Sequence, residues 1–103
     1  MAKLLVKGVF NITGHGIIMV GQVTEGTLQA GMKSKINEYE IQAKSMEANR
    51  VLLPELKTGE SAGIAIVKAT GPEDPPKSFF NFFSKGKYLD TIRSLKGETI
   101  EFL

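Results

Sequence analysis

Cysteine is absent from this chain of 103 residues, and histidine occurs once, as His15. Without cysteine there can be no disulfide, no thiolate metal site and no cysteine nucleophile. A single imidazole cannot supply a multi-histidine metal site. We therefore expect no bound metal.

Long apolar runs are also missing. No apolar stretch approaches the roughly 18 residues that indicate a membrane span. The start, MAKLLVKGVF, has its apolar run broken by Lys7 and Gly8, so we expect no secretion signal. The net charge of +2 is too small to indicate nucleic-acid binding by itself. We expect one globular, cytoplasmic domain over residues 1–103, with no membrane partner.

Motifs for catalysis and phosphate binding are missing as well. Gly14-His15-Gly16 begins like a dinucleotide fingerprint, but Met19 stands where the third glycine is required. Gly86-Lys87 is followed by Tyr88, where a P-loop requires Ser or Thr. The sequence suggests no nucleophile–base pair. We therefore expect no enzymatic activity and no cofactor.

Glycine, in contrast, is frequent and regularly spaced in the first third of the chain. Gly16, Gly21, Gly26 and Gly31 follow one another at intervals of five, a period of neither helix nor strand. Gly14 and Gly16 fit a hairpin turn, and Gly21 indicates a bulge or bend inside a strand. Gly26 and Gly31 bracket a short connection. Bent strands joined by tight turns predict a small closed barrel.

Apolar and alternating segments predict short strands along most of the chain. We expect strands over residues 4–12, 17–24, 33–36, 39–46, 51–53, 61–67 and 98–103. Residues 13–16 and 37–38 should be turns, residues 47–50 a break, and residues 54–60 a polar loop. Gly63 should mark a second internal bend. The fold class is therefore all-β.

Residues 69–93 interrupt this pattern. TGPEDPP is a turn-rich linker, and apolar residues at helical spacing follow it. The spacing predicts two short amphipathic helices separated by Gly86, at Phe79, Phe82 and Phe83 and at Tyr88, Leu89 and Ile92.

Four of the six phenylalanines lie in residues 79–83, and residues 77–96 carry five basic residues against one acidic. Aromatic rings among basic residues can stack on single-stranded nucleic acid. The interpretation we prefer is a helix that covers an open end of the barrel, with lysines at its solvated edge. A protein or membrane contact is the third alternative.

Residues 9–36 resemble the start of the second domain of translational GTPases such as elongation factor Tu and elongation factor 1-alpha. The shared pattern is Gly14, Gly16, Gly21, Val23, Gly26, Leu28 and Gly31. AKSMEANRVLLPELKTGESAGIAI, residues 43–66, resembles the second half of that domain, and LKGETIEFL its closing strand. The resemblance implies a closed six-stranded antiparallel β-barrel, with residues 69–93 as an insertion before the last strand.

The resemblance also implies binding residues. In the family this barrel packs against a GTPase domain, helps bind the aminoacylated 3′ end of tRNA and touches ribosomal RNA. Glu47 matches a glutamate that contacts the terminal ribose, and Arg50 matches a nearby basic position. Gly14 and His15 match a turn near the acceptor end, with Phe10 beside it. From the residues alone, His15 is either a solvated turn residue or a contact to a phosphate or partner.

Two hypotheses follow. The chain has neither a P-loop nor a guanine-specificity motif, so we expect a stand-alone, non-enzymatic relative of the barrel. It would bind tRNA, ribosomal RNA or a translation protein such as a GTPase, with Lys85, Lys87 and Arg93 of the insertion as further contacts. The alternative is a protein–protein interaction adaptor that uses the barrel face and the Phe-rich segment. The sequence leaves the oligomeric state open.

Overall fold

Side chains alternate between the inside and the outside along most strands of this all-β protein. In β3 (Lys33–Ile36) and β8 (Thr99–Phe102) every second residue is buried, as expected for strands with one face on a core. The computed structural model describes residues 1–71 and 87–103. Its other elements are β1 (Ala2–Ile12), β2 (Gly16–Gln29), β4 (Tyr39–Ala48), β5 (Val51–Leu53), β6 (Glu55–Lys57), β7 (Ser61–Thr70) and α2 (Lys87–Arg93).

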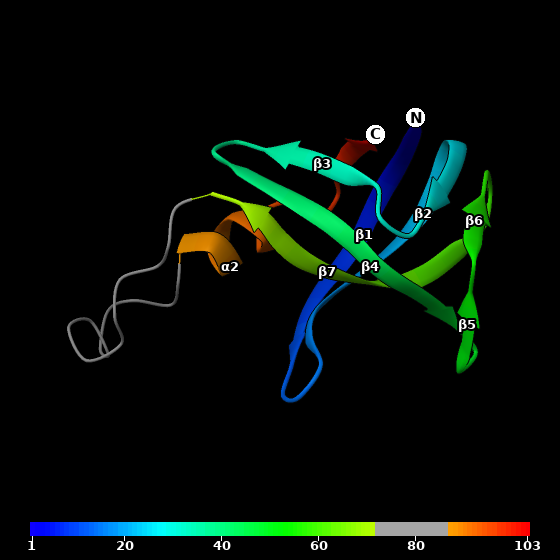
Figure 1. Ribbon diagram of the computed structural model, residues 1–103, viewed down its shortest axis with the longest axis horizontal. Coiled ribbons are helices and arrows are strands. Elements are labelled where there is room, and N and C mark those ends of the chain that lie inside the picture. The colour runs from blue at the N-terminus through cyan, green and yellow to red at the C-terminus, as the bar shows by residue number, and fades with distance from the viewer. Residues whose placement is uncertain (72–86) are drawn as a thin grey trace.

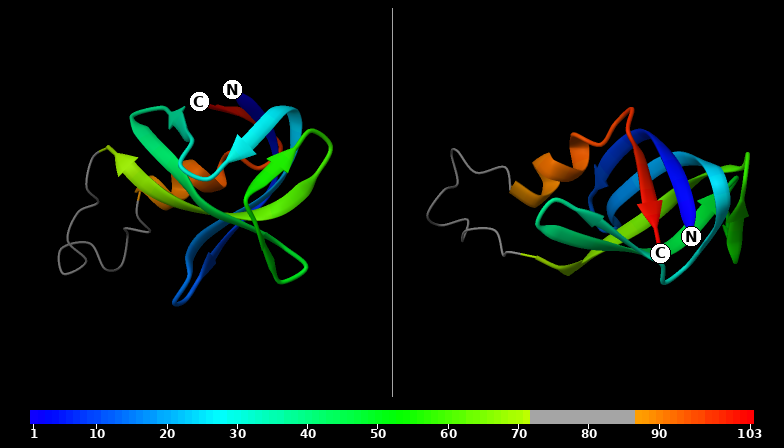
Figure 2. Two further views of the ribbon diagram at one scale, coloured as in Figure 1. Left: turned by 45° about the vertical axis from the view of Figure 1, so that its right-hand side comes forward. Right: turned by 90° about the horizontal axis from the view of Figure 1, so that it is seen from above.

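Six strands follow one another around a barrel in the order β3-β4-β7-β2-β1-β8 (Figures 1 and 2). The short strands β5 and β6 pair outside this order, with β4 and β2 respectively, and every pairing is antiparallel. The barrel closes where Lys33 and Leu103 exchange backbone hydrogen bonds of 2.9 and 2.7 Å. The predicted six-stranded antiparallel barrel is confirmed, and it is nearly closed.

The core consists of the inward side chains of these strands together with one residue of the helix. Phe102, Leu4, Met19 and Ile64 are among the largest side chains with no exposure to solvent. Ile92 of α2 is also fully buried in this core. Burial of apolar surface on this scale is the main stabilising term for a small domain.

Gly21 lies at an irregularity between β1 and β2, as predicted. Val6 pairs with Gly21 and Gly8 pairs with Val20, so Lys7 is an extra residue that forms a β-bulge. A Cβ atom on Gly21 would lie 2.7 Å from the carbonyl oxygen of Leu5. The two strands can approach this closely only because the residue has no side chain.

The second strand is longer than predicted, and the expected polar loop over residues 54–60 is wrong in part. β2 continues to Gln29 because its residues 27–29 pair with β6, which lies inside that loop. Gly26 is therefore a strand residue, with a φ of 76°. A Cβ atom there would overlap the carbonyl oxygen of Met1, so glycine lets the start of β1 lie against β2.

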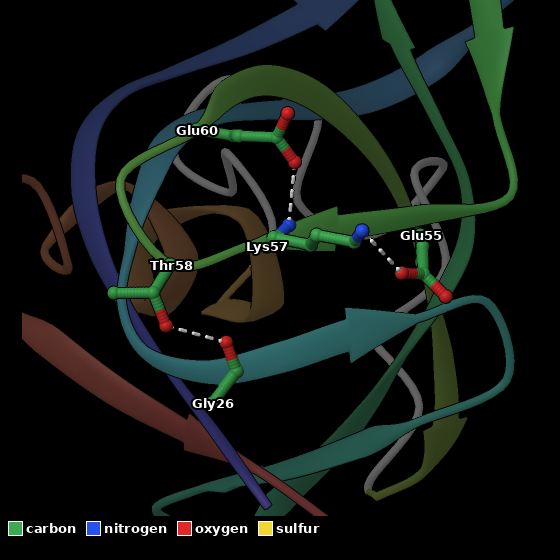
Figure 3. A network of polar contacts seen from close by, with 5 residues as sticks. All are labelled: Gly26, Glu55, Lys57, Thr58 and Glu60. Atoms are coloured by element: carbon green, nitrogen blue, oxygen red, sulfur yellow. Dashed lines mark hydrogen bonds and ion pairs between the residues drawn. The ribbon is translucent and has the colours of Figure 1, made fainter.

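Side chains stabilise the turn that joins β6 to β7 (Figure 3). The backbone N–H of Lys57 donates to Glu60 Oε1 at 2.7 Å, and the Thr58 hydroxyl donates to the Gly26 carbonyl at 2.8 Å. The ammonium of Lys57 lies 3.9 Å from Glu55 Oε2. The contacts of Lys57 stabilise the segment itself, and the bond from Thr58 to Gly26 attaches it to β2.

Other strand ends also differ from the prediction. β4 extends to Ala48 instead of residue 46, and only Asn49 and Arg50 remain in the turn, with φ values of 53° and 65°. Positive φ at both central residues is typical of a tight hairpin turn, and it allows β4 to continue into β5. β7 continues to Thr70, so the segment between the last strands begins later than residue 69. Gly63 pairs without a register shift, and the nearest shift lies at Lys44.

The second predicted helix is confirmed as α2, whereas the first, around residues 79–83, lies outside the described residues. Tyr88 of α2 contacts Tyr39 of β4 edge-on, with ring centroids 5.1 Å apart. The ammonium of Lys68 lies 5.6 Å from the centroid of the Tyr88 ring. These contacts, with buried Ile92, attach the helix to the barrel. Of the helices in the described part of the chain, none is long and apolar enough to cross a membrane.

We predict that Gly21→Ala lowers the free energy of unfolding by about 1–3 kcal/mol, because the new methyl group meets backbone. Urea denaturation measures the loss. Gly8→Ala is the matched control, since its Cβ would meet only the ring of the half-exposed Phe10, 3.1 Å away. A Gly21→Ala variant as stable as Gly8→Ala would contradict the close approach of the strands.

We predict a loss of stability at alkaline pH that depends on Tyr88. Burial, and then neighbouring Tyr39, raise the pKa of Tyr88 above its ordinary value of 10.0. The folded protein therefore holds this proton more tightly than the unfolded chain does, and the resulting stabilisation is lost as the pH rises above 10.0. Urea midpoints below and above that pH should differ less in Tyr88→Phe than in the wild type. Equal differences would remove Tyr88 as the cause.

Candidate functional site

The outer face of the sheet carries apolar and small side chains at one end of the barrel. Paired residues of neighbouring antiparallel strands share a face, so the register defines rows of side chains across the sheet. One row runs through Phe10, Ile18, Ala65 and Ser45, and the next through Gly8, Val20, Gly63, Glu47 and Leu52.

A cleft of about 650 Å³ opens over these rows. Ile18, Gly63 and Ala65 form its floor, and the small size of Gly63 and Ala65 leaves room above β7. The turn between β1 and β2 forms one wall, and β4 forms the other. The lining residues of the two walls are Ile12, Gly14, His15 and Gly16 on the turn side, and Lys44, Ser45 and Glu47 on β4. The volume lies within the range of small-ligand sites.

Four side chains of the lining are polar: His15, Lys44, Ser45 and Glu47. No ion pair and no hydrogen bond within residues 1–71 and 87–103 engages these four side chains. Their polar groups are therefore available to a ligand.

A second β-bulge turns two consecutive residues toward the cleft. Ala43 pairs with Ile66 and Ser45 pairs with Ala65, which leaves Lys44 as the extra residue. In a regular strand, Lys44 and Ser45 would point to opposite faces. Because of the bulge, both line the cleft, while Met46 returns to the core.

Exposed apolar side chains lie close to the cleft on both walls. Phe10 and Ile12 of β1 are 54% and 44% exposed, and Val51 and Leu52 of β5 are 57% and 68% exposed. Val51 pairs with inward-facing Ala48, so it lies on the other face of the sheet. We call Phe10, Ile12 and Leu52 the apolar rim. The β1–β2 and β4–β5 hairpins that carry them project toward the same end of the molecule (Figures 1 and 2).

No protein-family model matches the sequence. Among solved structures, the chain is similar to the translation elongation factor SelB from Methanococcus maripaludis in its apo form, with a TM-score of 0.66 and 19% sequence identity. The fold is that of a translation-factor barrel. The match covers 96% of this chain and 17% of that chain, so it concerns a small part of the factor. The predicted resemblance is confirmed as a likeness of fold.

Three of the predicted site residues, Gly14, His15 and Glu47, line one cleft of the translation-factor barrel. Phe10 does not line the cleft, but it pairs with Ile18, which does. Arg50 lies in the turn beyond Glu47 and outside the lining. The hairpin tip and the Glu47 region of β4 therefore line the same cleft.

The predicted residues of the insertion lie elsewhere or are not described. Arg93 is exposed in the last turn of α2 and does not line the cleft. Lys87 is the first residue of α2, and its side chain lies outside the described part of the structure, as does all of Lys85. Of these three side chains the structure describes only that of Arg93, which lies away from the cleft lining.

Sequence reasoning missed the floor residues Gly63 and Ala65 and the wall residues Lys44 and Ser45 as part of the site. All four lie within the stretch that resembles the second half of the family barrel, which was the available signal. A strictly alternating pattern would assign Lys44 and Ser45 to opposite faces of β4. The bulge that places both on one face has no clear mark in the sequence. Among the described residues, no three His, Cys, Asp or Glu side chains gather as they would around a metal ion.

We predict that the polar side chains of the cleft do not hold the fold together. Glu47→Gln and His15→Gln should each change the free energy of unfolding by no more than about 0.5 kcal/mol, as expected for exposed side chains without partners. Urea denaturation provides the measurement. A loss above about 1 kcal/mol in either variant would mean that the side chain has a structural role.

Proposed function

We propose that this translation-factor barrel is a non-enzymatic module that binds an unpaired end of an RNA of the translation machinery, in the cytoplasm. The observation that carries the proposal is the cleft itself. Gly14 and His15 on one wall face Glu47 on the other, across a floor of small and apolar residues. The similarity to an elongation factor supports a role in translation.

The chemistry of the cleft suits a single nucleotide. RNA is recognised with high selectivity where bases are unpaired and can stack on side chains, and Ile18 and Val67 offer apolar surface for such contact. The Glu47 carboxylate can accept hydrogen bonds from the 2′- and 3′-hydroxyls of a terminal ribose, and a 2′,3′-dideoxyribose end lacks both donors. The ligand class we propose is therefore the terminal nucleotide of a tRNA or ribosomal RNA.

The same residues support binding without catalysis. Ser45 and His15 both line the cleft, but no hydrogen bond between their side chains is present among the described residues, and a Ser–His nucleophile needs one. We propose accordingly that the protein binds and releases the RNA without modifying it.

The test compares a single-stranded RNA that has both terminal hydroxyls with the same RNA ending in a 2′,3′-dideoxynucleotide. We predict that the wild type prefers the hydroxyl end by about tenfold, the value of one hydrogen bond to a charged group. Glu47→Gln should lose most of this preference, and Glu101→Gln on β8 should keep it. Fluorescence anisotropy at low salt measures both affinities. Absence of binding, or equal affinity for the two RNA ends in the wild type, would overturn the proposal.

The second candidate function is a protein–protein interaction adaptor, and the apolar rim favours it. Phe10, Ile12 and Leu52 expose apolar surface close to one cleft, as docking sites for proteins do. Light scattering of the wild type and of Phe10→Ser/Leu52→Ser distinguishes this candidate. Self-association that the double variant abolishes, together with absent RNA binding, would favour the adaptor.

A further inference from the structure

The cleft is electrically asymmetric along β4, and the strand register shows how. Ala43 and Ile17 both pair with Ile66, so the following residue of β4, Lys44, lies level with the end of the β1–β2 turn. Glu47 and Val20 both pair with Gly63, farther from that turn. The cation of β4 is therefore nearer to the β1–β2 turn than the carboxylate is.

His15 lies at the same end of the cleft as Lys44. It belongs to the turn that immediately precedes Gly16 and Ile17, and it lines the cleft together with Lys44. Neither side chain engages a carboxylate within residues 1–71 and 87–103. An ammonium and an imidazole that line one cleft, with no acidic partner, form a favourable environment for an oxyanion.

We propose that Lys44, turned toward the cleft by the β4 bulge, is the contact for the phosphate on the 5′ side of the bound nucleotide. This inference rests on the proposed function, because it assigns a direction to the RNA in the same cleft. The terminal ribose lies at Glu47 and the preceding phosphate at Lys44 and His15. The rest of the strand leaves the cleft past the β1–β2 turn.

The distance between Lys44 and Glu47 suits one nucleotide. Lys44 and Glu47 are three residues apart on one strand, which places their Cα atoms at most roughly 10 Å from each other, since the bulge shortens the strand at Lys44. Both side chains line the same cleft, and the four-carbon stem of lysine can adjust its length to a phosphate. A ligand without a phosphate would leave Lys44 unused, and a ligand without hydroxyls would leave Glu47 unused.

The experiment measures the salt dependence of binding to the same hydroxyl-ended RNA. Each phosphate contact contributes about 0.7 to the slope of log K against log salt concentration for single strands. We expect Lys44→Gln to lower the slope by about that amount while it keeps the preference for hydroxyl over dideoxy ends. Lys44→Arg should keep the wild-type slope, because the charge remains.

The matched control is Lys35→Gln, which removes the same charge from β3. Lys35 lines a separate groove between β3 and β8, away from this cleft. An equal slope in Lys44→Gln and the wild type, or an equal decrease in Lys35→Gln, would overturn the inference. If the wild type still distinguished the two RNA ends in that case, the proposed function would stand. If the wild type bound no RNA, both would fall.

Discussion

The position of β7 between β2 and β4 is the constraint on which the rest of the structure depends. Hydrogen bonds join β7 to β2 on one side and to β4 on the other. These two ladders place the β1–β2 turn and the Glu47 region of β4 on either side of one strand. The cleft is therefore a consequence of strand order, since its two walls are distant in sequence and share only β7.

A barrel of six strands curves strongly, and this curvature explains the bulges at Lys7 and Lys44. Lys7 and Lys44 are each an extra residue opposite a regular partner strand, and each bulge increases the local bend and twist. At Lys7 the bend occurs where Gly21 allows the backbones to approach closely. The bulge at Lys44 also reorients side chains. The same irregularity therefore bends the barrel and places a lysine on its outer face.

The two faces of the sheet have separate roles. The inner face is filled by a continuous apolar core that includes Ile92 of α2. The outer face at the hairpin end has small residues, unpaired polar groups of the cleft and the apolar rim. Because the polar side chains of the cleft make no hydrogen bond or ion pair within residues 1–71 and 87–103, we expect that they can differ between proteins of this fold without loss of stability.

Much of the fold could be predicted from the sequence alone. Alternation identified the segments that became β1, β3, β4, β5, β7 and β8, and glycine spacing indicated turns and the bulge at Gly21. The predictions failed where pairing partners decide the structure. Residues 27–29 and 55–57 became strands because each lies against the other, and neither segment has a strand pattern strong enough to show this.

For the site, too, local sequence determined some features and the tertiary structure determined the others. Local sequence determined that Gly14-His15-Gly16 forms a turn and that Glu47 lies on or next to a strand. Only the tertiary structure brought the two together, since the strand register across β7 sets that distance. It also decided that Lys44 and Ser45 face the cleft, because a bulge arises from the mismatch between two paired strands, which neither strand specifies alone.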